Sequence, residues 1–112
     1  FLGTTRDHHD GRRVTQLSYE AYEPMALREL EALERESCER FGIEACTVSH
    51  RLGVVPPAEP SVVVVVASHH RGPAFDACRW VMDELKKRVP IWKKETYAEG
   101  GEEWVSGTKL EG

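Results

Sequence analysis

Apolar and polar positions in the first part of the chain follow the period of a strand. The stretch VTQLSYEAY at residues 14–22 alternates, which is typical of a strand buried on one face. The inward positions are expected to be Thr15, Leu17, Tyr19 and Ala21. The polar segment DHHDGRR at residues 7–13 has a central glycine and predicts a turn. We expect residues 1–5 to end a preceding strand, so that residues 7–13 form a hairpin loop.

A helical repeat follows between a proline and a glycine. Pro24 suits the first turn of a helix, and Gly42 suits its C-cap. Between them an apolar or small residue recurs three or four positions apart, with glutamates on the other side. These positions are Ala26, Leu30, Leu33, Ser37 and Phe41. The pattern predicts an amphipathic helix that ends at Gly42.

The rest of the chain predicts strands around a second helix. Residues 44–55 indicate a strand, residues 56–60 a turn, and SVVVVVAS at residues 61–68 a strand buried on both faces. A helix is expected from Pro73 to Pro90, which cannot continue it. Its apolar positions are Phe75, Cys78, Met82, Leu85 and Val89.

The order of elements predicts the fold class. After Pro90 we expect an extended segment, a turn and a last short strand, EWVSG. Two strands, a helix, two strands, a helix and a final strand predict an α+β fold, with helices on one face of a mainly antiparallel sheet. A chain of 112 residues favours a single domain, residues 1–112.

Composition and charge exclude several classes of function. The longest apolar run, residues 62–67, is far shorter than the roughly 20 residues of a membrane span. Three scattered cysteines favour a reducing cytoplasm, and no basic stripe with interleaved aromatics indicates nucleic-acid binding. Residues 69–94 carry seven cations and three acids, a net charge of +4, in a chain whose net charge is −4. This segment can hold a small anion. Because the chain lacks a starting Met, we expect residues upstream of Phe1 to be missing.

Two groups of cations are candidates for binding that anion. In HHRGP at residues 69–73, the expected helix N-terminus offers free amides, and His70 and Arg71 add donors and charge. The same residues fit a solvated loop equally well. In KKRVPIWKKE, the cations before the proline suit the last turn of a helix, where the helix dipole favours them.

The lysines after that proline need a separate account. In an extended segment Lys93 shares a side with Glu95, and Lys94 shares one with Trp92, so at most one lysine enters a given pocket. Trp92 is expected to be a core anchor. The five histidines and three cysteines show no zinc spacing, so no metal is expected, and His50 is interpreted as a hydrogen-bonded structural residue.

Several stretches together resemble one known family. GTTRDHHDGRRVTQLSYEAYEPMA, SHRLG, SHHRGPAFDACRWVMDELKKRVPIWKKE and EEW, in this order, resemble the large, catalytic subunit of molybdopterin synthase over nearly the whole chain. The resemblance implies an α/β hammerhead fold, with an N-terminal strand region missing upstream of Phe1. It further implies a cytosolic sulfurtransferase without a cofactor of its own. It also implies that cyclic pyranopterin monophosphate is converted to molybdopterin. The sulfur donor is then the C-terminal thiocarboxylate of a small ubiquitin-like partner subunit, bound to a homodimer of large subunits in a heterotetramer.

The resemblance also implies which residues act. Lys86 and Lys93 match the essential lysines of the family. The positions that match its substrate-binding residues are Arg6, His70, Arg71, Lys94 and Glu95. Because both reactants are anions, we expect Lys86 to stabilise oxyanionic states and transfer protons, and Lys93 to hold the anions.

Spacing within the second helix predicts that two copies share each site. Thirteen residues, or about 20 Å of helix, separate Pro73 from Lys86, which is more than one small pterin spans. We therefore expect Lys86 and Lys93 from one protomer and His70 and Arg71 from the other. An alternative of another class is a non-catalytic module that binds an anionic C-terminal tail or a small phosphate in the same groove.

Overall fold

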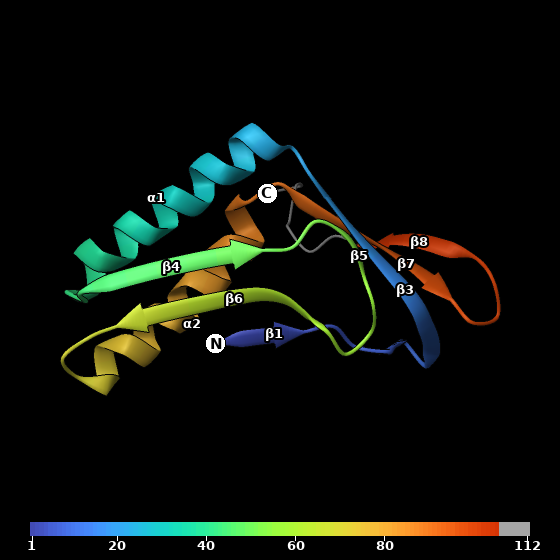
Figure 1. Cartoon of the computed structure of the whole chain (residues 1–112), viewed down its shortest axis with the longest axis horizontal. Coiled ribbons are helices and arrows are strands. Elements are labelled where there is room, and N and C mark those ends of the chain that lie inside the picture. The colour runs from blue at the N-terminus through green and yellow to red at the C-terminus, as the bar shows by residue number, and fades with distance from the viewer. Residues whose placement is uncertain (106–112) are drawn as a thin grey trace.

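The computed structural model describes residues 1–105 and contains two helices and eight strands in that range (Figure 1). In chain order the elements are β1 Leu2–Thr4, β2 His8–His9, β3 Arg12–Ala21, α1 Glu23–Phe41, β4 Ala45–His50, β5 Gly53–Val55, β6 Pro60–Ala67, α2 Arg71–Arg88, β7 Ile91–Tyr97 and β8 Glu102–Val105. Neither helix is long and apolar enough to cross a membrane.

The strands form two sheets, and every pair in them is antiparallel. One sheet has the order β1-β6-β4, and the other has the order β2-β3-β7-β8, with β5 also paired to β3. Both helices lie against the β1-β6-β4 sheet. The other sheet extends away from this layer as a twisted arm (Figure 1). The expected α+β class with a mainly antiparallel sheet is confirmed, although one sheet was expected and two are present.

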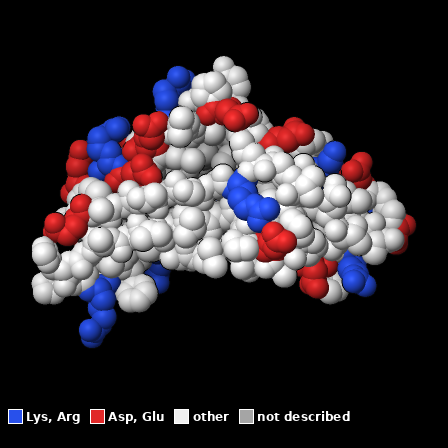
Figure 2. All heavy atoms as spheres, in the orientation of Figure 1, with Lys and Arg blue, Asp and Glu red and all other residues white. Residues whose placement is uncertain are grey.

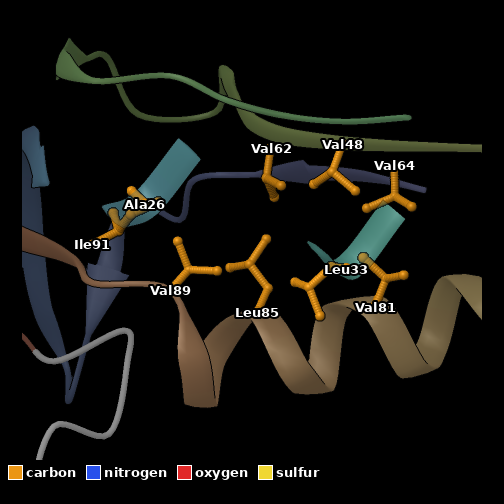
Figure 3. Close-up of a cluster of buried hydrophobic side chains, with 9 residues drawn as sticks. All are labelled: Ala26, Leu33, Val48, Val62, Val64, Val81, Leu85, Val89 and Ile91. Carbon is orange, nitrogen blue, oxygen red and sulfur yellow. The ribbon is translucent and has the colours of Figure 1, made fainter. Parts of the chain in front are cut away.

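The main core lies between the helices and the three-stranded sheet (Figure 3). Leu33 of α1 and Val81 of α2 are fully buried there, next to Val64 of β6. The inward face of α2 consists of Ala77, Val81 and Leu85. Phe75 is 72% exposed, so the predicted apolar stripe of this helix was wrong at its first position.

The valine-rich strand β6 is buried on one face only. Val62 and Val64 face the core, whereas Val65 is 58% exposed. The prediction of burial on both faces was therefore wrong for this chain, because only one side of the β1-β6-β4 sheet carries helices. The outward face of this sheet carries few charged side chains (Figure 2).

The start of the chain differs from the expected hairpin. Residues Leu2–Thr4 pair with β6, and the hairpin is instead the tight β2–β3 turn at Asp10 and Gly11, both with positive φ. Within β3 the register against β7 shifts at Thr15, which is a β-bulge. Val14 and Leu17 are consequently both buried and Thr15 is exposed, so the predicted inward position of Thr15 was wrong.

The helix ends follow local sequence. Proline stands in the first turn of α1, and Gly42 ends it with φ 64°, both as predicted. Helix α2 starts at Arg71, two residues before the expected Pro73, and ends where Val89 turns extended before Pro90. Arg88, in its last turn, forms a bidentate ion pair with Glu36 of α1 at 3.0 and 2.8 Å.

Candidate functional site

A half-enclosed hollow lies where the end of α2 meets the start of β7. The turn at Pro90 returns the chain into the β3–β7 pair, so Lys86 and Lys93 come to line the same space. The hollow has a volume of about 140 Å³. Its lining residues are Tyr19, His50, Ser61, Val62, Met82, Leu85, Lys86, Ile91 and Lys93.

Lys93 is half-buried and experiences three nearby charges. Burial lowers its pKa, the neighbouring carboxylate of Glu95 opposes the shift, and the cations Arg6 and Lys86 reinforce it. Arg6 and Lys86 therefore both lie within electrostatic reach of Lys93 in a single protomer. Two lysines that line a largely apolar hollow, with the charge of Arg6 near one of them, are suited to binding an anion and to exchanging a proton near it.

Lys94 lies on the opposite face of β7, as the alternation predicts. Its ammonium lies 5.5 Å from the centre of the Trp104 ring and 3.7 Å from a carboxylate oxygen of Glu102. Trp92 shares this face and lines a shallow hollow with Glu20 and Trp104. Trp92 belongs to neither buried cluster, so its predicted role as a core anchor was wrong.

Glu95 is buried and held by neighbours rather than open to the hollow. One of its oxygens lies 3.1 Å from Nδ1 of His9 and 3.0 Å from the hydroxyl of Tyr97. Burial, together with Glu95 and Glu103, raises the pKa of Tyr97 to about 12, so its phenol stays protonated at neutral pH. The arrangement fixes the carboxylate of Glu95 two positions from Lys93.

His70 and Arg71 lie at the other end of α2. His70 is the N-cap residue, and its side chain makes no capping bond within residues 1–105. Arg71 lines a separate, open groove with residues of β6 and with Phe75. Fifteen positions of helix, or about 22 Å, separate Arg71 from Lys86. One protomer thus brings Arg6, Lys86 and Lys93 together and keeps His70 and Arg71 apart from them.

Sequence reasoning missed two residues of the hollow, Tyr19 and His50. Their rings meet edge to face with centroids 4.9 Å apart. The alternation of β4 contained a signal, because His50 shares its inward side with Val48 and Cys46. The described residues contain no cluster of His, Cys, Asp or Glu side chains that could hold a metal ion.

Comparison with known proteins finds one family. A family model described as MoaE protein matches residues 1–88. A molybdopterin synthase catalytic subunit of Pyrococcus abyssi is 46% identical over 109 residues, covering 97% of this chain and 73% of that protein. One of Oryza sativa is 52% identical over 104 residues, covering 93% of this chain and 53% of that protein.

Solved structures agree with these sequence relatives. Molybdopterin synthase from Staphylococcus aureus superposes with a TM-score of 0.88 at 33% identity, covering 94% of this chain and 76% of that one. A molybdopterin biosynthesis MoaE protein from Burkholderia ambifaria superposes with a TM-score of 0.79 at 36% identity, covering 98% of this chain and 71% of that one. The shared architecture extends over nearly the whole of residues 1–105.

Proposed function

Because this chain belongs to the MoaE protein family, we propose that residues 1–112 act as the catalytic domain of a molybdopterin synthase. The reaction is sulfur transfer to cyclic pyranopterin monophosphate, which yields the dithiolene of molybdopterin. The donor is the C-terminal thiocarboxylate of a small ubiquitin-like partner subunit. The compartment is the cytosol, which the three free cysteines support.

The observation that carries this proposal is the joint lining of one hollow by Lys86 and Lys93, with Arg6 nearby. A cyclic phosphate and a thiocarboxylate are both anions and repel each other. Fixed cations at an apolar wall bring them together and need no reorganisation during the reaction. The sulfur comes from the partner, so the chain needs no sulfur-carrying cysteine of its own.

Each cation has its own role in the proposed reaction. Lys86 stabilises the oxyanion that develops when the tail carbonyl is attacked, and it transfers protons. Lys93 and Arg6 hold the anions of the substrate and the tail. Glu95, buried two positions from Lys93, opposes the loss of the Lys93 proton. Lys94 adds positive charge from the outer face of β7, next to the substrate-holding Lys93.

The size of the hollow supports a site shared by two copies of the chain. Ligand pockets usually measure about 300–1,000 Å³, whereas this hollow measures about 140 Å³. His70 and Arg71 lie too far along α2 to complete it from the same protomer. We propose that they complete the site of a second copy in a homodimer, with one small partner subunit bound to each large subunit.

An apolar surface near Arg71 supports the homodimer. Leu2, Val65 and Phe75 are 56%, 58% and 72% exposed and border the groove that Arg71 lines. This outward sheet face is also poor in charge (Figure 2). Contact between two such faces removes the apolar side chains from water and places the N-terminus of α2 at the subunit boundary.

Reconstitution with thiocarboxylated partner and the cyclic pterin tests the proposed function. The unmodified chain is expected to form dithiolene, and Lys86→Ala to lose at least about 100-fold in turnover while it still binds the partner. Lys87→Ala is the matched control, because Lys87 is exposed and pairs only with Glu84 in the described residues. If a fully thiocarboxylated partner gives no product with the unmodified chain, the proposed enzymatic function is ruled out.

A further inference from the structure

His50 lines the same hollow as the two lysines and comes from a different element. It is the last residue of β4, and its ring packs edge to face on Tyr19, which pairs with Lys93 across the β3–β7 ladder. His50 and both lysines line the same space. The imidazole is thus part of the wall that a reactant in this hollow touches.

The hydrogen bond of His50 fixes which ring nitrogen carries the proton. Nδ1 lies 2.7 Å from the backbone carbonyl of Arg51. A carbonyl oxygen only accepts, so Nδ1 is the donor, and in the neutral ring Nε2 is left with a free lone pair. The backbone therefore presets the tautomer of a proton acceptor.

The Nε2 atom is open to the adjoining space. It makes no hydrogen bond among residues 1–105, and no side-chain nitrogen or oxygen buried in that range lacks a partner. Nε2 is consequently not sealed in the core, and His50 lines three hollows, one of them together with both lysines. A water molecule or a substrate atom can reach it there.

The surroundings keep His50 neutral and ready to accept a proton. Burial lowers its pKa, and the bond to the Arg51 carbonyl opposes this only in part. Three cations, one acid and a phenol line the hollows around the ring. These groups are Lys86 of α2, Lys93 of β7, Arg51 after β4, Glu23 of α1 and Tyr19 of β3.

The proposed reaction needs a base at this place. Once the thiocarboxylate sulfur has bonded to the pterin, the acyl group of the tail is still attached to that sulfur. Release of the tail as a carboxylate requires one oxygen atom, and water supplies it. The water must lose a proton as it attacks the acyl carbon, at a point close to the oxyanion-stabilising cations.

We propose that His50 is the catalytic base that activates this water, an inference that rests on the proposed function. Nε2 accepts a proton while the water oxygen bonds to the acyl carbon. The bond from carbon to sulfur then breaks, the electron pair stays on sulfur, and the pterin keeps a thiolate. The tail leaves as a carboxylic acid that loses its remaining proton to solvent.

His50→Asn tests this role in the reconstituted complex. The asparagine amide keeps a donor where Nδ1 stands but removes the Nε2 base. We expect the rate of product formation to fall by about 100-fold or more, and partner covalently joined to pterin to accumulate, visible as a mass increase of the small subunit. The unmodified enzyme should lose rate as the pH falls through the lowered pKa of His50, and His50→Asn should lack this limb.

Two further variants keep the outcome interpretable. His8→Asn is the matched control, because the His8 side chain is 62% exposed, pairs with Asp7 and is not among the residues that line the hollow. His50→Gln, which preserves a polar group near Nε2 without a base, replaces His50→Asn if the latter does not fold. Full activity of the folded variant without adduct overturns the role of His50. Failure of the unmodified chain overturns the proposed function instead.

Discussion

The ring centroids of Tyr19 and His50 lie 4.9 Å apart, and the backbone of Tyr19 pairs with that of Lys93. This one tyrosine on β3 connects a lysine of β7 to a histidine of β4, which belongs to the other sheet. The candidate site therefore forms where the two sheets meet, and its residues depend on how the sheets are joined.

The anion-holding role of Lys93 predicts an unusual pH dependence. Burial lowers its pKa, and only the protonated form attracts an anion, so affinity should be lost as pH rises through that lowered value. Above it the KM for the pterin should rise by about tenfold per pH unit. Lys93→Arg keeps its charge throughout, and its KM should stay flat over the same range. A parallel rise in both proteins would contradict the role.

The outward face of β6 is predicted to be the homodimer surface. Val65→Glu should shift the protein from dimer to monomer, because a carboxylate would be buried against apolar groups without a partner. Sedimentation velocity at micromolar concentration measures the change. Val54→Glu is the matched control, since Val54 is 56% exposed on β5 of the other sheet. Equal dimerisation of both variants would argue for a different interface.

Arg88 is predicted to join α2 to α1. It forms the bidentate pair with Glu36 and also contacts Glu29 at 3.1 Å. Arg88→Met should lower the free energy of unfolding by about 1 kcal/mol, the upper end for a partly exposed pair. Arg79→Met is the control, because Arg79 is exposed on the same helix and has no ion pair within residues 1–105. Chemical denaturation of both variants measures the difference.

The ion pair between Arg88 and Glu36 also predicts how the stability difference depends on pH. The hydrogen bond from Arg88 lowers the pKa of Glu36 in the folded state. The stabilisation is then present above the ordinary pKa of glutamate and is lost as the pH falls through the lowered value. The gap in stability between the unmodified chain and Arg88→Met should close in acid. A gap that widens there would contradict the ion pair.

The end of α1 is predicted to require glycine. Gly42 has φ 64°, so Gly42→Ala should cost about 1 kcal/mol of stability, although an added Cβ meets no atom of residues 1–105 within 4 Å. Gly72 lies in the first turn of α2 without a positive φ, and its Cβ would also meet open space. Gly72→Ala should be neutral or slightly stabilising. Comparing the thermal unfolding of the Gly42→Ala and Gly72→Ala variants separates the effect of backbone strain from that of packing.

Local signals explain what the sequence predicted about the fold. The bounds of α1 follow from a proline and a glycine that act within one turn, and the end of α2 follows from Pro90. The outer face of β6 could not be predicted, because a run of valines does not reveal which side carries helices. The bulge at Thr15 and the exposure of Phe75 likewise depend on partners far along the chain.

The candidate site divides in the same way. Alternation along β7 correctly separated Lys93 from Lys94, since it is a property of extended backbone alone. The position of Arg6 near Lys93 was not predictable, because it depends on where the loop between β1 and β2 lies in the folded chain. His50 was predicted only as a hydrogen-bonded residue, and its bond to Arg51 fits that prediction. Its place beside the lysines depends on Tyr19.

The central claim is that sulfur transfer occurs at a site to which two copies of the chain contribute. Heterodimers of Lys86→Ala and Arg71→Ala chains, isolated with two different tags, test it most directly. Each heterodimer would hold one intact site and one site with both changes, so we predict about half the activity of the unmodified dimer. Each parent homodimer should be inactive under the same conditions. Heterodimers no more active than either parent would contradict the shared site.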